Sequence, residues 1–524
     1  MVIPEKHQSW LVFVVSLLIC TSFIGWYPIY ILDESRNAEA AREMFVMGDY
    51  LIPNFNGELR TDKPPLHYYF MALGYKLFGI NAIGGRFFSG VFGALTVLIS
   101  FKSAKKWLGK KEGSILVIIL LSSLFFVQEF HLAVPDPYLI FFISSSLFFF
   151  FEYYKNKKWK WLLFAYACIG LGILTKGPIA IAIPGMTMVL FLLLKKEFTL
   201  NSILSFGPVL GLFFALALAF PWYFLVHEAT LGEWTKGFFL DHNVNRFNSG
   251  KEGHGGFFLL TPLFVILGLL PFSVFIIQSF MEAWKQRANN DLILFSFACA
   301  SVTIVFFSAA STKLPNYPMP CYPFIALLIA FYLTRIEALP KRRKTMKWSL
   351  VFLVFLSFLF PIAGFIALSL EKGFYDVRWV SLFLLIVTLT SIFGWVYYRK
   401  GALEKSFLGI AGGWVLTGLA LFGIIYPLLT RKSPVYQASK IIGENSKVIV
   451  FQRFDSAFPI NFNRTFLVFD TLIEVEKYLV KHPDAFILTN TRNKESLKKM
   501  EQRFELLLEQ KALFENHTTR IYRK

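Results

Sequence analysis

The sequence predicts an all-α, polytopic membrane protein with a small α/β domain outside the membrane at its C-terminal end. Two observations predict the membrane part. Hydrophobic residues make up 55% of the 524-residue chain, with a mean hydropathy of +0.54, and apolar runs of about 20 residues recur until about Arg431. Each run can cross the bilayer core as a helix. The alternating pattern that barrel strands need is absent, which excludes a β-barrel.

About thirteen apolar runs are predicted to span the membrane. They are residues 10–32, 82–101, 114–130, 137–153, 161–174, 179–194, 203–226, 257–280, 292–310, 319–333, 348–370, 379–398 and 407–429. The first run is too long for a cleavable signal and has no small-residue cleavage site, so we expect an uncleaved first span. We therefore assign residues 1–430 to a transmembrane domain and residues 431–524 to a soluble domain.

The distribution of Lys and Arg predicts the orientation. With a cytoplasmic N-terminus, the predicted cytoplasmic loops hold about 22 Lys and Arg, roughly twice the number on the other side. These loops are residues 102–111, 155–160, 195–196, 285–287, 335–347 and 399–405. They account for most of the net charge of +19, and because no soluble module gathers the basic residues, nucleic acid is not a predicted partner. An odd number of spans puts the C-terminal domain outside.

The four cysteines lie within or beside apolar runs, so neither a disulfide framework nor a thiolate metal site is predicted. They are interpreted as small core residues.

A charged segment, residues 32–66, stands between the first two spans and is the strongest functional signal. Ionisable groups at a membrane edge are functional candidates by default, although a solvated loop is the alternative. Residues 35–47 have helical spacing, with charged residues on one side and small or apolar residues on the other. This pattern predicts a short helix lying in the membrane interface. A second short helix is expected over residues 66–78, after the Pro64–Pro65 break.

Three carboxylates are candidate catalytic residues. Asp33, the first acid after the first span, could act as a general base toward an acceptor hydroxyl or could orient the acceptor. Its alternative role is an ion pair with Arg36. Glu34 is a second candidate for the same role. Asp136 lies between two prolines where a span begins, and its alternative role is a helix N-cap.

Four cations from separate outer segments are candidate ligands for a phosphate. They are Arg36, Lys63, Arg246 and Lys313. Around one cavity they would stabilise a leaving phosphate as its charge grows; alternatively, each extends to lipid headgroups. Tyr317, in a proline-broken loop, could bond to the phosphate or the sugar, although aromatic residues are also common at the membrane interface.

A divalent metal site is a weaker hypothesis. Asp62 and the histidines His67, His242 and His254 could supply ligands, with Asp62 and His254 as the candidates retained, but no spacing matches a standard pattern. His131 is expected to satisfy a hydrogen bond at a helix end.

After residue 431 the pattern changes to that of a soluble α/β domain. Residues 447–451, 464–470 and 485–490 are predicted strands, and residues 471–481 and 494–508 have helical patterns. Nothing in this domain has catalytic spacing.

Several motifs, in order, resemble the GT-C class of polyprenyl-phosphate-sugar glycosyltransferases. The resemblance is to the bacterial branch that contains the aminoarabinose transferase of lipid A modification and is related to protein O-mannosyltransferases. The motifs are DESRNAEAAREM, PNFNGELRTDKPPL, VPDP, TKGP, HNVNRF with a following HGG, and KLPNYPMPCYP, and they extend to about Tyr322. As a set they are specific, whereas each alone is weak.

The resemblance implies a GT-C fold with two juxtamembrane helices, Asp33 as catalytic aspartate, Asp136 as a second functional acid, and the four cations as phosphate contacts. It also implies an undecaprenyl-phosphate sugar donor and inverting transfer to lipid A, a glycan or a protein, on the periplasmic face of a bacterial inner membrane. One departure is Asp62, where relatives often carry Glu before the lysine. The absence of a Gly-rich nucleotide loop agrees with a lipid-linked donor.

Three other functions remain open. A transporter or flippase usually places its polar site near the bilayer midplane and often shows internal repeats, whereas here the acids and cations lie at one face and no repeat is evident. A transferase that uses a polyprenyl-diphosphate glycan would share most of the chemistry. A structural scaffold that binds partners through the soluble domain would need none of these residues.

Overall fold

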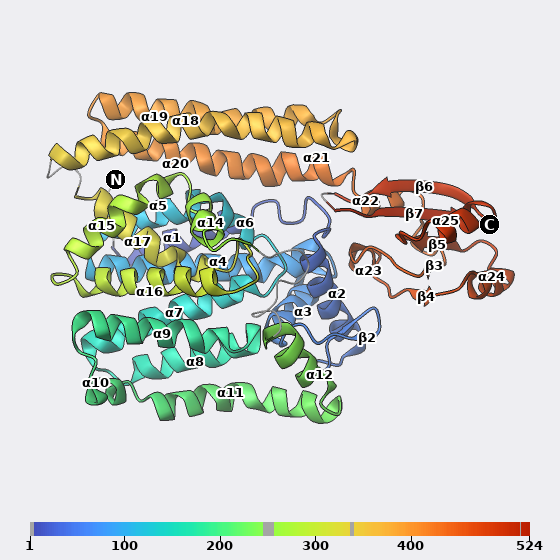
Figure 1. Ribbon diagram of the computed structural model, residues 1–524, viewed down its shortest axis with the longest axis horizontal. Coiled ribbons are helices and arrows are strands. Elements are labelled where there is room, and N and C mark those ends of the chain that lie inside the picture. Colours follow the sequence, from blue (N-terminus) through green and yellow to red (C-terminus); the bar gives the residue numbers. More distant parts are fainter. Residues whose placement is uncertain (1–4, 245–255, 336–339, 514) are drawn as a thin grey trace.

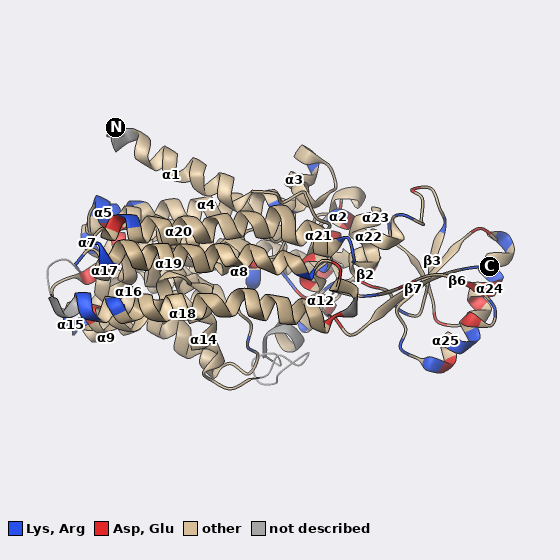
Figure 2. Ribbon diagram, turned by 90° about the horizontal axis from the view of Figure 1, so that it is seen from above, with Lys and Arg blue, Asp and Glu red and all other residues tan. Residues whose placement is uncertain are grey.

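The computed structural model describes residues 5–244, 256–335, 340–513 and 515–524. Helices run side by side along the long axis, and the C-terminal domain projects from one end of this bundle (Figure 1). We call this end of the bundle the domain end and the opposite one the far end. Lys, Arg, Asp and Glu gather at the two ends, while the middle of the bundle is nearly free of them (Figure 2).

The helices of the membrane part follow the predicted apolar runs. In chain order they are α1 Glu5–Cys20, α4 Ala82–Trp107, α5 Lys110–Ser122, α6 Leu124–Glu129, α7 Asp136–Asn156, α8 Lys160–Lys176, α9 Ile179–Lys195, α10 Leu200–Ser205, α11 Pro208–Ala229, α12 Glu233–Lys236, η1 Gly237–Val244, α14 Leu260–Gly268, η2 Phe272–Phe275, α15 Ile276–Lys285, α16 Asp291–Ala309, η3 Met319–Cys321, α17 Tyr322–Leu333, α18 Pro340–Leu370, η5 Lys372–Phe374, η6 Arg378–Leu384, α19 Leu385–Arg399, α20 Leu403–Ala420, η7 Leu421–Ile425 and α21 Tyr426–Thr430.

Within the described residues, 7 helices are long and apolar enough to cross a membrane, and 8 if the pair α14 and α15, bent by 116°, forms one span. This composition is that of a multi-pass membrane protein, as predicted. Each predicted run has a helical counterpart, but several of these helices are short or broken. The count of thirteen spans therefore stays a prediction.

The first predicted span, residues 10–32, ends sooner than expected, because α1 stops at Cys20. The chain beyond it is held by Arg86 of α4, whose Nη1 donates to the carbonyl oxygens of Ile24 at 2.7 Å and Tyr27 at 3.0 Å. These bonds satisfy carbonyl groups that helical hydrogen bonds would otherwise have used. The chain can therefore turn before it reaches the charged segment.

Two short helices follow, as predicted: α2 over Leu32–Met47 and α3 over Leu66–Phe78. Helix α2 is more buried than its pattern predicts, because most of its side chains are covered, charged ones included; its place at the membrane interface stays a prediction. On its polar side the Arg42 guanidinium binds both carboxylate oxygens of Glu39, at 2.5 and 2.7 Å. Helix α2 packs between α3 and α23 of the C-terminal domain, which exclude water from its charged side. The charges of Arg42 and Glu39 are therefore satisfied by each other and not by water.

A tight hairpin joins α2 to α3. Strands β1 Asn54–Phe55 and β2 Glu58–Leu59 pair antiparallel, and the turn residues Asn56 and Gly57 have φ angles of 54° and 81°. This is the left-handed backbone that an Asn-Gly hairpin turn requires. The chain after the hairpin carries Arg60, Asp62 and Lys63.

The C-terminal domain is built on a five-stranded sheet in the order β4-β3-β5-β7-β6. Strands β3 Val448–Phe451, β4 Leu467–Phe469 and β5 Phe486–Thr489 are parallel, whereas β6 Glu505–Lys511 and β7 Thr518–Arg523 add antiparallel pairs. The helices are α22 Pro434–Ala438, α23 Ala457–Phe462, α24 Leu472–Lys481 and α25 Lys494–Glu501. A buried apolar cluster lies on each face of the sheet.

The predicted α/β class of this domain is therefore confirmed. The expectation of a helix over residues 494–508 is wrong in its second half, because α25 ends at Glu501 and the residues from Glu505 pair with β7. Antiparallel pairing across a sheet decided between two local conformations there.

Candidate functional site

Asp33 lies in the first turn of α2, and its side chain is exposed at the domain end. Across the described part of the chain it forms no ion pair with Arg36, which is half-buried. The negative charge of Asp33 acts on Arg60 and on Glu129, so these groups lie within electrostatic reach of it. An exposed carboxylate facing buried ionisable groups is available to a substrate.

Asn37 connects the Asp33 turn to the segment that carries the cations. Its Nδ2 donates to the carbonyl of Asp33 at 2.7 Å. Its Oδ1 lies 3.2 Å from His67 Nε2 and accepts from the Tyr68 hydroxyl at 3.3 Å. The same hydroxyl accepts from Arg60 Nε at 3.2 Å. A chain of buried hydrogen bonds therefore sets the separation between the acid and the first cation.

His67 is completely buried among cations. Burial lowers the pKa of its imidazole well below the usual value, and the positive charges of Lys63, Arg60 and Lys176 lower it further. The ring is neutral. Because an amide oxygen can only accept, Nε2 carries the proton and donates to Asn37 Oδ1. These charges also show that Lys63, from the chain after the hairpin, and Lys176, from the end of α8, approach the same side chain.

The metal hypothesis gains no support from the residues that the structure describes. Asp62 is paired with Arg60 at 2.9 Å, the cations around His67 oppose a metal ion, and the described ranges contain no group of three His, Cys, Asp or Glu that could hold one. His254 and the side chain of His242 lie outside the description. We derive no step through a metal.

Asp136 and Lys176 join two of the motifs. Asp136 begins α7 and is almost fully buried, and its Oδ1 accepts from Lys176 Nζ at 2.6 Å. Pro135 holds the N-cap position and Asp136 is the first residue of the helix, so the N-cap alternative does not apply and the carboxylate is used in the ion pair. Lys176 Nζ also lies 4.9 Å from the centre of the Tyr317 ring. VPDP, TKGP and KLPNYP are thus brought together by one lysine.

Glu129, at the end of α6, is a buried acid that we did not select from the sequence. Asn316 Nδ2 lies 3.5 Å from its Oε1, and the charges of Asp136, Lys176 and Asp33 all act on it. The sequence does distinguish Glu129, because it is the one ionisable residue in the apolar run 114–130. Such a residue within a predicted span is a functional candidate.

Glu34 has a geometry that differs from that of Asp33. Its side chain is fully buried, with Oε1 and Oε2 accepting from Arg86 at 2.6 and 2.9 Å. Oε1 also accepts from the backbone N–H of Ala133 at 3.0 Å. The carboxylate therefore ties α2 to α4 and to the loop before α7. We interpret Glu34 as a positioning residue and not as a group that touches substrate.

The ammonium group of Lys313 is likewise bound within the protein. Its Nζ donates to the carbonyl oxygens of Phe307 at 3.2 Å, of Ser308 at 2.7 Å and of Ala310. Three carbonyls match the three N–H donors of an ammonium group, and the lysine thereby caps the C-terminus of α16. In this arrangement its donors do not point toward a phosphate.

The remaining predicted residues divide as follows. Lys63 is buried beside His67, as described above, and Tyr317 is half-buried against Phe307 and Lys176. Arg246 lies outside the described residues. Two cations of this region, Arg60 and Lys176, were not among those selected from the sequence. Arg60 was passed over because nothing in its local pattern distinguishes it from a solvated residue.

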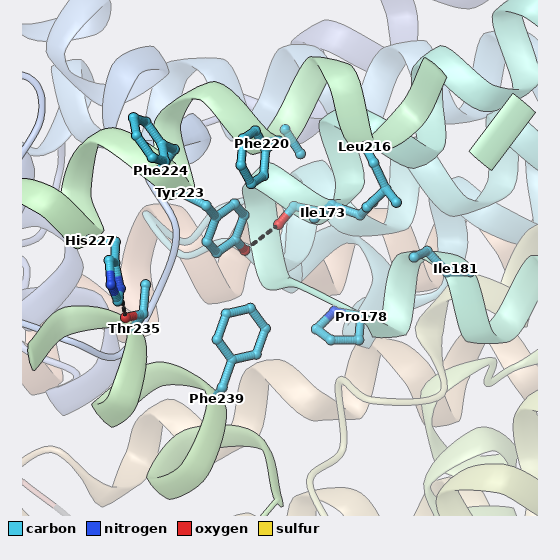
Figure 3. Close-up of a pocket in the computed structure, with 11 residues that line it drawn as sticks. Ile173, Pro178, Ile181, Leu216, Phe220, Tyr223, Phe224, His227, Thr235 and Phe239 are labelled. Carbon is cyan, nitrogen blue, oxygen red and sulfur yellow. Dashed lines mark hydrogen bonds between the residues drawn. The ribbon is translucent and has the colours of Figure 1, made fainter. Parts of the chain in front are cut away.

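An apolar pocket of about 580 Å³ is lined by residues of α8, α9 and α11 and by Thr235 and Phe239 (Figure 3). Ile173 and Pro178, on either side of Lys176 in the chain, form one wall, and Tyr223 and Phe239 face them. The Tyr223 hydroxyl donates to the carbonyl of Ile173 at 3.1 Å, which joins α11 to α8. The chain that forms this wall therefore also carries Lys176, which links the apolar pocket to the charged groups.

Comparison with known proteins agrees with this architecture. The family described as dolichyl-phosphate-mannose-protein mannosyltransferase matches residues 62–224. An uncharacterized protein of Aquifex aeolicus is 30% identical over 334 residues, which is 63% of this chain and 64% of that protein. The undecaprenyl phosphate-alpha-4-amino-4-deoxy-L-arabinose arabinosyl transferase of Edwardsiella ictaluri is 28% identical over 317 residues, covering 59% of this chain and 56% of the enzyme. The matches thus span less than two thirds of these relatives.

Solved structures extend the likeness over nearly the whole chain. The crystal structure of ArnT from Cupriavidus metallidurans bound to undecaprenyl phosphate superposes with a TM-score of 0.81 at 19% identity, covering 99% of this chain and 98% of that one. The archaeal oligosaccharyltransferase AglB from Archaeoglobus fulgidus gives 0.51 at 11% identity, covering 93% and 70%. The fold class predicted from the sequence is confirmed, and so is the resemblance to this group of glycosyltransferases.

Proposed function

We propose that this protein is a membrane glycosyltransferase that moves a sugar from a polyprenyl-phosphate donor to an acceptor of the bacterial envelope. One observation carries the proposal: acids and cations from four separate segments converge at one end of an apolar helix bundle, beside an apolar pocket. That arrangement fits a molecule with an isoprenoid tail, a phosphate and a sugar in sequence. The likeness to proteins named for undecaprenyl phosphate supports this choice of donor.

Each part of the donor has a matching part of the site. The apolar pocket takes the first isoprene units, whose burial favours binding. We assign to Lys63 and Arg60 the role of stabilising the phosphate as its negative charge grows, with Arg36 and Arg246 as further candidates from the sequence. Asp136, paired with Lys176, faces the same region and is proposed to orient the sugar.

The reaction forms one bond and breaks another at the anomeric carbon. An acceptor oxygen attacks that carbon while the bond to the phosphate oxygen breaks, and polyprenyl phosphate leaves with the electron pair, which inverts the configuration. For a hydroxyl acceptor, Asp33 takes the proton. For a phosphate of lipid A, which is already ionised, Asp33 positions the acceptor and no base is needed.

The finer assignments belong to the same proposal. The transferred sugar is a pentose or a hexose, since the similar enzymes are named for a pentose and the matched family for a hexose. Lipid A is the first candidate acceptor, followed by a glycan or a protein. We place the N-terminus in the cytoplasm and the domain end, with its site, on the periplasmic side of the inner membrane.

The test is transfer by the purified protein. Protein in proteoliposomes is given undecaprenyl phosphate carrying a labelled aminopentose or hexose, together with lipid A, and the products are identified by mass spectrometry. We expect free polyprenyl phosphate and a glycosylated acceptor in equal amounts. Movement of intact donor across the vesicle with no cleavage of the sugar–phosphate bond would instead identify a transporter. Mass analysis of lipid that co-purifies with the protein gives the donor independently.

A further inference from the structure

The C-terminal domain contacts two of the segments that bring charge to the site, the start of α2 and the hairpin that leads to Arg60. We infer that this domain is a positioning element, which fixes the distance between Asp33 and the cations of the chain after the hairpin. This inference rests on the proposed function, because the distance matters for turnover only if these groups act in sugar transfer. It gives a role to a domain whose own sequence has no catalytic pattern.

The first contact is between α23 and the start of α2. The Ser456 and Ser35 hydroxyl oxygens lie 2.7 Å apart and are buried. Asn461 Nδ2 donates to the carbonyl of Ile29 at 2.6 Å, on the chain that leads into α2. Ser35 is two residues from Asp33, so the first turn of α2 is held from the outside by α23.

The second contact is at the tip of the hairpin. Asn56 Oδ1 accepts from the backbone N–H of Phe466 at 2.7 Å, and Asn56 Nδ2 donates to the carbonyl of Phe466 at 3.1 Å. The rings of Phe55 and Phe454 stack at 6.2 Å with 5° between their planes. The hairpin is thus paired to the segment before β4, and it leads directly to Arg60.

The two contacts are joined within the membrane part as well. The carboxylate of Glu43, on α2, accepts from the backbone N–H groups of Asn56 at 2.5 Å and Gly57 at 3.0 Å. The hairpin therefore lies between α2 and the C-terminal domain and is bound to both. The α2 helix, the hairpin and α23 form one closed set of contacts around the charged end of the site.

This arrangement has a consequence for catalysis. Asp33 and Arg60 come from different elements, and both elements are bound to one folded domain. Reaction rates depend steeply on such separations, and a misplacement of about 1 Å can cost up to about a hundredfold. A domain that touches neither reacting group can therefore control turnover.

A third contact keeps the domain attached if the other two are loosened. Leu513 is buried in a cluster with Leu368 and Phe374, and Lys511 Nζ binds both carboxylate oxygens of Glu371 at 2.8 Å. Since these residues lie far from Asn56 and Ser456 in sequence and join other elements, variants at the first two contacts test positioning without removing the domain.

The experiment uses the full-length protein with Asn56→Gly and Ser456→Ala, alone and combined. Asn56 has a φ of 54°, a backbone that glycine adopts without strain, so Asn56→Gly removes the two side-chain bonds and preserves the turn. The matched control is Asn463→Gly, because Asn463 has a φ of 52° and is exposed in the same domain. Ser456→Thr keeps the hydroxyl and serves as the conservative rescue.

Two readouts are measured. A spin label on Val46→Cys reports the mobility of α2, since Val46 is exposed on that helix and the four native cysteines are buried and react poorly. Turnover and KM for an undecaprenyl-phosphate sugar report the site. We expect the double variant to raise label mobility and to lower kcat by about tenfold to a hundredfold, with little change in KM because the apolar pocket is untouched. Asn463→Gly and Ser456→Thr should resemble the wild type.

Unchanged label mobility in the double variant would overturn the inference, as would increased mobility with wild-type kcat. If the wild-type protein transferred no sugar from any donor, the proposed function would be wrong, but this result would not by itself contradict the inference about the C-terminal domain. In that case the mobility of α2 still decides whether the C-terminal domain holds it in place.

Discussion

At the far end of the bundle, Asp291 binds Lys155 at 2.8 Å and Lys195 at 2.5 Å, with the lysine side chains 32% and 22% exposed. At the domain end, Glu34 binds Arg86 at 2.6 Å, and both side chains are 0% exposed. The far-end charges keep contact with water and lipid headgroups, so such pairs contribute little stability. The pair of Glu34 and Arg86 has lost that contact, and its two members depend on each other.

This difference separates two reasons for charge in a membrane protein. By the positive-inside rule we assign the far-end lysines a role in orienting the protein, which a lysine at a neighbouring position would also fill. Buried charges at the domain end, such as those of Glu34 and Arg86, are fixed by particular partners, and a change to one member leaves the other unsatisfied. The same residue types therefore predict function at one end and topology at the other.

The largest effect should separate an acid at the domain end from an acid at the far end. Asp33→Asn removes the carboxylate proposed as base or orienting group, and we expect transfer to fall by about a hundredfold or more. Lys63→Ala should do the same by removing a phosphate cation. Asp291→Asn, at the far end, should stay within about twofold of wild type. Transfer is measured with purified protein in lipid, after checking insertion. Retained activity in Asp33→Asn would remove our assignment of the base.

The free energy of unfolding should depend more on the buried pair of Glu34 and Arg86 than on a partly exposed pair at the far end. Glu34→Gln leaves the Arg86 guanidinium buried without a counter-charge, and we expect a loss of about 3 kcal/mol or more. Lys106→Gln, at the far end, removes the 47% exposed member of a pair whose partner, Glu152, keeps Trp107 and Asn156 as donors, and should cost less than about 1 kcal/mol. Thermal unfolding in detergent compares the two. Equal losses would mean that burial does not distinguish the ends.

Tail length should reveal whether the domain-end pocket holds isoprenoid. Ala219 is buried and lines the pocket, so Ala219→Trp fills it, and KM for an undecaprenyl donor should rise by about tenfold. A donor whose chain is too short to enter should be unaffected. Val209→Trp places the same side chain at an exposed position on the same helix and is the control. A similar rise for both donors would place the tail elsewhere.

The smallest effect concerns pH and the domain itself. Hydrogen bonds to Asp455 and Glu515 raise the pKa of His517 from 6.5 to about 9. A group whose pKa is raised by folding stabilises the folded state fully below its unfolded pKa, and this contribution is lost as pH rises through about 9. Because Asp455 also accepts from the N–H of Ala457 at the start of α23, the loss should be felt at α23.

His517→Gln should therefore flatten the fall in thermal stability between about pH 6 and pH 10, by an amount on the order of 1 kcal/mol. His482→Gln, at a histidine paired with Lys447 on the same domain, is the control. An identical pH dependence in wild type and His517→Gln would show that this pair does not report on the domain.

Much of the architecture could be read from local patterns. Apolar runs predicted the helices, and a proline break with helical spacing after it predicted α3 at its observed bounds. The early end of α1 could not be predicted, because it depends on Arg86, which is distant in sequence. Nor could the burial of α2, since its charged side is covered by a domain about 400 residues further along the chain.

The site shows the same limit. Motifs led us to select Asp33, Asp136 and Lys63 as candidates, since ionisable groups at a span edge are uncommon. They did not reveal that Lys313 is committed to the end of α16, because helix capping looks the same in sequence as ligand binding. Arg60 and Lys176 were missed because their importance lies in what they contact, His67 and Asp136 among others.

The apolar pocket has one wall on α11, and the most apolar part of the α10–α11 segment is only 17% buried within the protein. This helix therefore faces lipid on most of its surface. A substrate tail can enter sideways from the bilayer without passing through water. For such a molecule, the concentration that matters is its mole fraction among the membrane lipids. Adding plain phospholipid should therefore slow the reaction, even when the amount of donor per volume of sample is unchanged.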